Sequence, residues 1–315
     1  MSFSSDVKKE LAAVMPGARH CEIAELAAII SLTGRIEINA KGGYILWIHT
    51  ENPYVADTFY RLVKDVSSCG CDVCSRLSTR KKSMSYTVVL SDSDAVIWIL
   101  SALKYIGPDG NINDDFSLVS ESVIQLSCCK KAFIRGAFLA SGSLGDPKKA
   151  YHFEIVTESQ EKAEALVSVF EGIGLKARST KRKNHYLTYL KEGDEIVDVL
   201  GCMEAPVSLM ELENIRILKD VRNEVNRRVN CETANIEKTA KASARQLSDI
   251  EYISETKGLD WLSEGLQDVA RTRLAYPDAT LSELGKKLQV PLGKSGVNHR
   301  LTKISSIAED LRGGK

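Results

Sequence analysis

Apolar positions change between helical and strand periodicity in the same order twice along this chain. The first series opens with an apolar stretch of helical spacing at 25–34. It ends at Gly34, a residue that often terminates helices because it accepts a left-handed conformation. Alternating apolar and polar positions then predict strands, and a 3.6-residue period predicts helices. The predicted elements are strands at 35–40, 44–50, 72–78 and 84–90 and helices at 52–67 and 92–106.

The second series repeats this order about 100 residues later. Its apolar helix at 133–142 again ends at a glycine, Gly142. A repeat of this length indicates duplication of a whole subdomain rather than a solenoid. We therefore expect two halves, at about 21–107 and 128–205, that pack around a pseudo-twofold axis. The further elements of the second half are strands at 151–157, 176–180 and 185–191 and helices at 159–174 and 194–203.

The patterns predict four regions along the chain. A helical arm at 1–20 precedes the duplicated domain at 21–205. A helical linker rich in Asn and Arg follows at 206–245, and an all-helical domain occupies 246–315. The chain has 315 residues, which is long enough for two domains.

The segment 276–311 has the pattern of a helix-turn-helix. Thr280 and Glu283 have the T-x-x-E spacing of a capping box at the start of the first helix. The sequence VPLG at 290–293 breaks that helix. The second helix should start near Ser295, because serine is a favourable N-cap residue. The positions expected to face the core are Val297, Leu301 and Ile304.

The polar face of this second helix carries the candidate base-reading side chains. Asn and Arg pair bidentately with adenine and guanine edges, and a recognition helix reads bases with its N-terminal half. Between 280 and 305 there are five basic residues and one acidic residue. The alternative is a plain helical bundle with a solvated polar face. The predicted DNA contacts are Thr280, Lys294, Ser295, Asn298, His299, Arg300 and Lys303.

The distribution of charge is more informative than its sum. The chain has 42 Lys and Arg against 42 Asp and Glu, so net charge indicates no partner. Two similar basic pentapeptides, STRKK at 78–82 and STKRK at 179–183, lie in the same hairpin of each half with no acidic residue nearby. Two basic hairpins related by a twofold suit duplex DNA, although solvated hairpin tips are the alternative. The predicted phosphate contacts are Arg76, Arg80, Lys81, Lys82, Lys176, Arg178, Lys181, Arg182 and Lys183.

The composition is that of an ordinary globular protein, with 43% hydrophobic and 27% charged residues. Charged residues interrupt the N-terminus where a signal peptide would need an apolar core. No apolar run approaches the roughly 20 residues of a membrane span. We therefore expect a soluble cytoplasmic protein, associated with the nucleoid and not with membranes.

The eight cysteines of such a chain should be reduced thiols. Three of them crowd into CGCDVC at 69–74, but no second Cys-x-x-Cys or His pair completes the usual four ligands of a zinc site. The alternative, which we favour, is a turn between a helix and a strand. The sequence thus predicts no metal and no cofactor.

The two glycine-terminated helices resemble the motif of LAGLIDADG homing endonucleases, at LAAIISLTG (26–34) and IRGAFLASG (134–142). The resemblance implies an α+β fold in which the motif helices pack at the pseudo-twofold axis and antiparallel sheets form a saddle for DNA. Small residues permit this close approach. They are Ala27, Ala28, Gly136, Ala137 and Ala140.

In that family an acidic eighth motif residue from each half holds magnesium at the scissile phosphates. Thr33 and Ser141 stand at these positions, and neutral hydroxyls do not replace carboxylates as Mg²⁺ ligands. Glu37 and Asp146 lie beyond the helix ends at different offsets in the two halves. We therefore expect no nuclease activity and no other enzymatic activity.

The combination of modules resembles the WhiA family of sporulation regulators over essentially the whole chain. The most specific segments are SFSSDVKKEL (2–11), RRVNCETANIEKT (227–239), RLAYPDATLSELG (273–285) and KSGVNHRL (294–301). The resemblance implies a non-enzymatic, DNA-binding transcriptional regulator that acts in sporulation, or in cell division and chromosome segregation. Two alternatives stay open. One is an active endonuclease, and the other is a scaffold whose N-terminal domain binds a protein partner.

Overall fold

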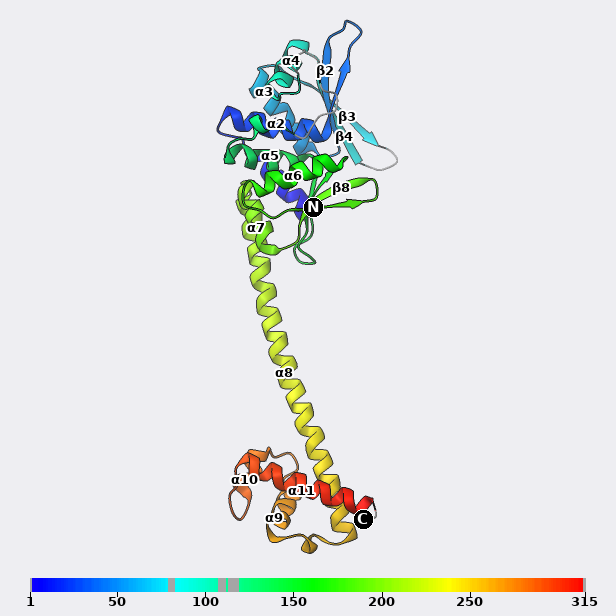
Figure 1. The fold of residues 1–315 in the computed structure, drawn as a ribbon, viewed down its shortest axis with the longest axis vertical. Helices are drawn as coiled ribbons and strands as arrows, with labels where there is room; N and C mark the ends of the chain where they lie inside the picture. Colours follow the sequence, from blue (N-terminus) through cyan, green and yellow to red (C-terminus); the bar gives the residue numbers. More distant parts are fainter. Residues whose placement is uncertain (1, 79–82, 107–111, 113–118, 314–315) are drawn as a thin grey trace. The chain divides into compact units, whose positions relative to one another are not determined.

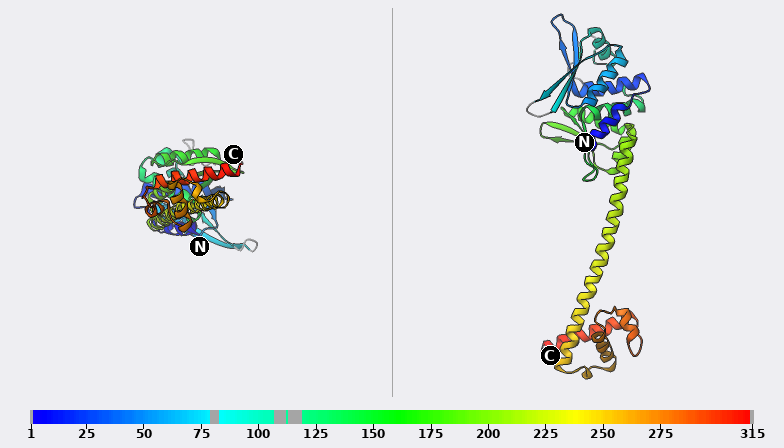
Figure 2. Two further views of the ribbon diagram at one scale, coloured as in Figure 1. Left: turned by 90° about the horizontal axis from the view of Figure 1, so that it is seen from below. Right: turned by 180° about the vertical axis from the view of Figure 1, so that it is seen from behind.

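The computed structural model describes residues 2–78, 83–106, 112 and 119–313 (Figures 1 and 2). Two compact units make up the chain, Met1–Lys219 and Asp220–Lys315. The first unit is α+β and the second is helical. None of the described helices combines the length and apolar character needed to cross a membrane.

The first unit contains the predicted duplication. Its first half comprises α2 (Arg19–Thr33), β1 (Gly34–Ile38), β2 (Tyr44–Thr50), α3 (Pro53–Ser67), β3 (Asp72–Ser78), β4 (Ser83–Leu90) and α4 (Ser93–Ala102). Its second half, after the short 3-10 helix η1 (Glu121–Val123), comprises α5 (Ser127–Ser141), β5 (Gly142–Leu144), β6 (Phe153–Thr157), α6 (Gln160–Glu171), β7 (Arg178–Arg182), β8 (His185–Leu190) and α7 (Gly193–Cys202).

The two halves have the same sheet topology. The strand orders are β1-β2-β4-β3 and β5-β6-β8-β7, and all the pairings are antiparallel. The helices α2 and α5 each contain 15 residues and each run directly into the first strand of their half. The predicted repeat and fold class are therefore confirmed.

The glycines at the ends of α2 and α5 do not act as predicted. Gly34 and Gly142 have φ values of −71° and −79°, so neither is left-handed. A Cβ at Gly34 would lie 2.5 Å from the carbonyl oxygen of Ile30, and one at Gly142 would lie 2.3 Å from the ring of Phe138. Glycine is needed here because the chain turns sharply from helix to strand against the last helical turn.

The helices α2 and α5 pack closely against each other at the centre of the first unit. A Cβ on Gly136 would lie 2.5 Å from the carbonyl oxygen of Glu25 and 3.1 Å from the Cβ of Ala28. Ala27, Ala28 and Ala137 are fully buried. These small residues allow the close approach that the motif resemblance implies.

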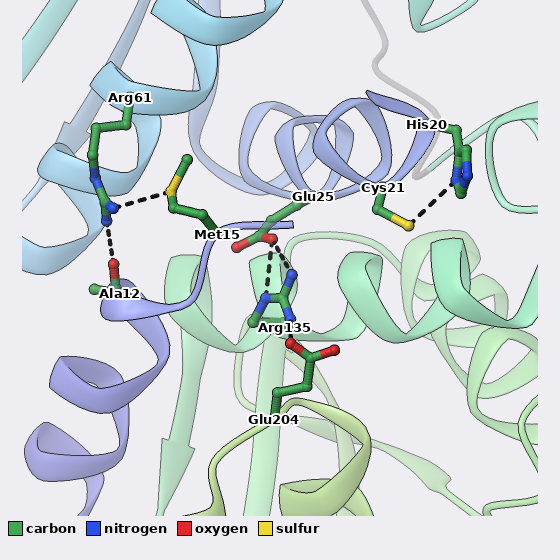
Figure 3. A network of polar contacts seen from close by, with 8 residues as sticks. All are labelled: Ala12, Met15, His20, Cys21, Glu25, Arg61, Arg135 and Glu204. Carbon is green, nitrogen blue, oxygen red and sulfur yellow. Dashed lines mark hydrogen bonds and ion pairs between the residues drawn. The ribbon is translucent and has the colours of Figure 1, made fainter. Parts of the chain in front are cut away.

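A buried ion pair crosses this helix interface (Figure 3). Arg135 of α5 donates from Nη2 and Nε to Oε2 of Glu25 in α2, at 2.7 and 3.0 Å. Both side chains are almost completely buried, and Nη1 of Arg135 also donates to Glu204 at 3.1 Å. Burial raises the pKa of Glu25, although the nearby Arg135 opposes this rise.

The predicted N-terminal arm is part of the core of the first unit. Val7 and Leu11 of α1 (Phe3–Ala13) are fully buried in it, and Nζ of Lys8 donates to the carbonyl oxygen of Leu139 at 2.9 Å. The amphipathic face of α1 covers apolar surface that α5 would otherwise expose. The segment predicted as a helical arm at 1–20 thus contains a helix that packs into the first unit.

The helix α8 (Pro206–Thr256) has 51 residues and continues through the boundary predicted at 245. It is followed by the 3-10 helix η2 (Leu259–Trp261), α9 (Glu264–Ala275), α10 (Leu281–Lys287) and α11 (Lys294–Arg312). The end of α8 and the last three helices share a separate apolar core. Its fully buried members include Ile250, Ile253, Ala270, Leu284, Val297 and Ala308.

Candidate nucleic-acid interface

The sheet of the first half presents a groove of about 760 Å³ on its outer face. Side chains alternate between the two faces of a strand. Leu46, Ile48 and Val88 therefore point into the core, and their neighbours point outward. The groove is lined by Leu32, Thr33, Arg35, Glu37, Ile45, Trp47, His49, Thr87 and Val89. The end of the first motif helix, at Thr33, thus lies next to the outer face of the sheet.

Arg76 extends this outer face toward the edge strand. It lies opposite Ser85 in the β3–β4 register, on the same face as the groove residue Thr87 two positions along β4. Its side chain is exposed. The other basic residues predicted for this hairpin, Arg80, Lys81 and Lys82, lie outside the described residues.

The equivalent hairpin of the second half carries basic residues on both of its faces. Arg178 and Arg182 lie opposite Tyr189 and His185, on the outer face, and all of β7 is exposed. Lys181 lies on the other face, with Nζ 5.5 Å from the ring centroid of Tyr186. The predicted set therefore does not form a single surface, because neighbouring strand residues alternate in direction.

Two further lysines of this set lie outside the strands. Lys183 occupies the turn between β7 and β8 with a φ of 57°. Lys176 lies in the connection between α6 and β7. Both are exposed, so they extend the positive charge around the hairpin without sharing one face.

A carboxylate interrupts the positive charge on the outer face of the second sheet. Glu154 accepts hydrogen bonds from Oγ of Ser143 at 3.0 Å and Nε2 of His152 at 2.8 Å, and Arg182 lies 4.0 Å away. Burial opposes its ionisation, but these partners together lower the pKa of Glu154. The outer face therefore carries mixed charge at neutral pH.

The motif positions that hold acids in homing endonucleases carry hydroxyls at the helix ends. Oγ1 of Thr33 donates to the carbonyl oxygen of Ile29 at 2.7 Å, and Oγ of Ser141 is buried without a partner in the described structure. Asp146 caps a turn by accepting from the backbone N–H of Lys148 at 2.9 Å. Over the described residues, no group of three or more potential metal ligands gathers at this end of the helices.

The first helix of the predicted helix-turn-helix begins as expected. Oγ1 of Thr280 accepts from the backbone N–H of Glu283 at 3.3 Å, and Oε2 of Glu283 accepts from the backbone N–H of Thr280 at 2.8 Å. These reciprocal bonds form the capping box, and they lower the pKa of Glu283. Both the side chain and the backbone N–H of Thr280 are therefore engaged in capping the helix.

The N-cap of the second helix lies two residues before the predicted cap, Ser295. Gly293 is the N-cap of α11, so Ser295 is the second helical residue and its side chain does not cap. The close contact between Gly285 and Leu292 sets this start, because a Cβ on Gly285 would lie 2.1 Å from the carbonyl oxygen of Leu292. The predicted core positions are confirmed, since Val297, Leu301 and Ile304 are buried.

Arg300 has a structural contact that the sequence did not reveal. Its Nη1 donates to the carbonyl oxygen of Gly265 at 3.0 Å, and the side chain is half-buried. Position 300 adjoins the buried stripe of α11 on the side that faces α9. This contact helps to pack α11 against α9, and base reading by Arg300 stays a prediction.

Lys294 and Asn298 line a groove of about 600 Å³ beside the start of α11. They are four residues apart and therefore lie on one face of the helix. The opposite wall belongs to α8 and includes Asn235, Lys238 and Gln246. Thr280 and Ser282 at the start of α10 complete it. Ser295, His299 and Lys303 are exposed along the adjacent face of α11.

Arg273 fixes this arrangement from inside the second unit. Its guanidinium donates to the carbonyl oxygens of Pro277 and Ala279 at 3.2 and 2.6 Å and to Oε1 of Gln246 at 2.9 Å. The side chain is 2% exposed, and burial lowers the pKa of Arg273. It holds the connection between α9 and α10 against α8, which positions the groove walls.

Three family models match this chain. They are a WhiA N-terminal LAGLIDADG-like domain over residues 19–104, a WhiA LAGLIDADG-like domain over 130–222 and a WhiA C-terminal HTH domain over 225–308. The probable cell division protein WhiA of Lachnoclostridium phytofermentans is 44% identical over 315 residues, which are 99% of this chain and 100% of the relative. The chain belongs to the WhiA family.

Two other matches extend over nearly the full length. The probable cell division protein WhiA of Alkaliphilus oremlandii is 44% identical over 317 residues, covering 100% of this chain and 99% of the relative. The crystal structure of full-length WhiA from Thermatoga maritima has a TM-score of 0.58 and 27% identity, covering 98% of each chain. The family resemblance and the fold inferred from the sequence are therefore confirmed.

The structure of this WhiA-family chain brings together only part of the predicted helix-turn-helix set. Thr280, Lys294 and Asn298 meet in one groove, whereas Arg300 faces α9. The wall supplied by α8 was missed. Its signal in the sequence was a row of polar residues at helical spacing in a segment that we assigned to a linker, namely Asn235, Lys238, Thr239 and Ser243.

Proposed function

We propose that this chain is a non-enzymatic, DNA-binding transcriptional regulator that acts in cell division and chromosome segregation, and in sporulation where the organism forms spores. The observation that carries the proposal is the groove at the start of α11. It exposes an amide, Asn298, and two ammonium groups, Lys294 and Lys238, within a domain matched by the WhiA C-terminal HTH model.

The chemistry of the groove suits duplex DNA. An exposed Asn near the start of a recognition helix can pair bidentately with adenine. Lysines near a helix N-terminus attract phosphates, and the N-terminal N–H groups add to this attraction. We assign base reading to Asn298 and phosphate contacts to Lys294 and Lys238, with Ser295, His299 and Lys303 next to them on α11.

The basic residues on the outer faces of the sheets supply further phosphate contacts in this proposal. Arg76, Arg178 and Arg182 lie on the outer faces of the two equivalent hairpins. A second surface that binds the same DNA raises affinity, because its binding is local once the first surface is engaged. The negative charge of Glu154 limits the attraction between this face and DNA phosphates. We therefore assign the sheets a supporting contact with DNA and the groove at α11 the primary one.

The names of the two relatives support the cellular role, since both are called probable cell division proteins. Thr33 and Ser141, at the motif positions that would hold magnesium, support the absence of nuclease chemistry. We expect the protein to act in the cytoplasm on chromosomal DNA.

The test uses the full chain and fluorescence anisotropy on DNA fragments obtained by selection from a random pool. Asn298→Ala should weaken binding to the selected site by about 1–3 kcal/mol and leave binding to random DNA almost unchanged. Lys294→Ala should weaken binding to all sequences alike. It should also lower the salt slope, which is the slope of the logarithm of the binding constant against the logarithm of the salt concentration, by about 1. Lys257→Ala, which removes an exposed charge elsewhere in the second unit, is the matched control.

The sheets are tested with Arg178→Ala/Arg182→Ala against the control Lys181→Ala on the opposite face of the same strand. The double variant should lower the salt slope by about 2, and the control should change it less. If the double variant leaves the salt slope unchanged, the sheets do not touch DNA. The scaffold function, with a protein partner on the first unit, would then replace this part of the proposal.

A further inference from the structure

Four potential metal ligands meet at the starts of the two central helices. His20 and Cys21 lie in the first turn of α2, and Cys128 and Cys129 lie in the first turn of α5. Each pair occupies the second and third positions of its 15-residue helix. The repeat therefore places the pairs at equivalent positions, and the pairing of α2 with α5 brings them together.

The distances suit one small ion. Nδ1 of His20 is 3.2 Å from Sγ of Cys129 and 3.3 Å from Sγ of Cys21. All four donor atoms lie within 4.8 Å of one another. A tetrahedral zinc ion with bonds of about 2.3 Å to sulfur and about 2.0–2.1 Å to nitrogen keeps its ligand atoms about 3.5–3.8 Å apart. A contraction of about 1 Å at the widest pair reaches that geometry.

We propose that His20, Cys21, Cys128 and Cys129 form a structural site for a single zinc ion that joins the two halves of the first unit. The set of three cysteines and one histidine is typical of structural zinc, and it leaves no coordination position for water. Soft thiolate ligands select zinc over magnesium. An iron–sulfur cluster needs more room, because ligand atoms bound to different iron atoms lie farther apart than ligand atoms around a single tetrahedral ion.

The protein holds these ligands in place and leaves an access path. Cys21 and Cys129 are buried, whereas His20 and Cys128 are exposed. Next to them, the guanidinium of Arg19 donates to the carbonyl oxygens of Asp65 and Val66 at the end of α3. The same group lies 5.4 Å from the ring centroid of Trp98. These contacts fix the start of α2, so the ligands on it are preorganised.

The position of the cluster separates it from any nuclease chemistry. Cys21 and Thr33 lie near opposite ends of α2, about 18 Å apart at about 1.5 Å of rise per residue. The ion would stabilise the pairing of the halves at this end, as the buried Glu25–Arg135 pair does nearby (Figure 3).

The sequence concealed this site because its ligands come as two adjacent pairs from distant segments. The cysteine-rich CGCDVC attracted attention instead, but it does not join the cluster. Residues 68–71 connect α3 to β3. Cys69 and Cys71 are half-buried there against the core, and Cys74 is exposed on β3. A search for Cys-x-x-Cys spacing cannot find pairs that only the fold unites.

The experiment measures the zinc content of the full chain, purified under reducing conditions and without metal-affinity chromatography. Mass spectrometry of the metal content should find one zinc per chain in the wild type and in the control Cys74→Ser, which removes an exposed thiol outside the cluster. Cys128→Ser and His20→Asn alter exposed ligands and should fold. Each should bind zinc more than tenfold more weakly, since loss of even a supporting group weakens metal sites about 10- to 100-fold.

Cobalt provides a second readout on the wild type alone. The stripped protein titrated with Co²⁺ should develop the intense visible absorption of tetrahedral thiolate coordination, saturating at one ion per chain, and zinc should displace it. Zinc should also raise the thermal midpoint of the wild type and of Cys74→Ser, but not of Cys128→Ser.

Several results would overturn the proposal. They are a zinc-free wild type that gives no cobalt spectrum, equal zinc affinity in Cys128→Ser and the wild type, and loss of zinc in Cys74→Ser. Iron–sulfur absorption in the purified protein, or a disulfide between α2 and α5 that persists in reducing buffer, would also exclude the zinc site.

Discussion

Replacing Arg135 by methionine should strongly destabilise the first unit. The substitution keeps most of the apolar volume but removes the guanidinium that donates twice to Oε2 of Glu25. Oε1 of Glu25 already lacks a partner in the described structure, and the side chain is fully buried. Arg135→Met would therefore leave a buried carboxylate without its hydrogen-bond donor, with only the weaker attraction of Arg61 to offset its charge. Breaking a buried ion pair in this way typically costs about 3–5 kcal/mol.

The pH dependence of this loss has a definite sign. Burial raises the pKa of Glu25 above its unfolded value, and removing Arg135 should raise it further. A group with a raised folded pKa contributes its stability at low pH and loses it as pH rises through the folded pKa. The deficit of Arg135→Met relative to the wild type should therefore shrink when the pH is lowered from 7 to 5.

The assay is urea unfolding of the full chain, followed by the fluorescence of Trp47 and Trp98 in the first unit. Arg135→Met should lower the urea midpoint in proportion to about 3–5 kcal/mol, and Glu25→Leu/Arg135→Met should recover most of the loss. The control in the same unit is Arg35→Met, which breaks the exposed pair with Glu158 at 3.2 Å and should cost under about 1 kcal/mol. A loss below about 1 kcal/mol for Arg135→Met, or a double variant no more stable than the single one, would refute the reasoning.

Three further predictions concern the packing and ends of helices. Gly136→Ala should lower the free energy of unfolding by about 1–3 kcal/mol, because its Cβ would lie 2.5 Å from the carbonyl oxygen of Glu25; thermal unfolding should show no such loss for Gly17→Ala, which meets no atom within 4 Å. Thr280→Ala should cost about 1 kcal/mol in the second unit, measured by urea unfolding with Trp261 as probe, because it removes the capping box. Burial lowers the pKa of Lys8 to about 8. Because the folded pKa lies below the unfolded one, the stability of the wild type relative to Lys8→Met should rise between pH 8 and 10, by at most about 1.4 kcal/mol per pH unit. Urea titrations that give the same pH dependence of stability for both proteins would contradict this.

The features set by local pattern could be predicted from the sequence. The duplicated order of helices and strands follows from periodicity, and the capping box at Thr280 follows from a four-residue spacing. The ends of the motif helices at Gly34 and Gly142 were also placed correctly, although for another physical reason. These signals act within a few residues, so they need no knowledge of the fold.

The features set by tertiary contacts could not be predicted. Whether Arg300 faces solvent or the carbonyl oxygen of Gly265 depends on how α11 is rotated against α9. The direction of Lys181 depends on the register of β7 with β8. The approach of His20 to Cys129 depends on the pairing of α2 with α5. In each case the partner is distant in sequence, and no spacing rule connects the two.

The central claim is that this chain holds DNA through the groove at Lys294 and Asn298 without cutting it. The most direct measurement incubates the full chain with supercoiled plasmid carrying a selected site in the presence of Mg²⁺, then resolves the products on a gel before and after removal of the protein. We predict retarded plasmid that is recovered fully supercoiled, and no retardation with Lys294→Ala/Asn298→Ala at the same protein concentration. Nicked or linear plasmid that accumulates with time, or retardation unchanged in the double variant, would contradict the claim.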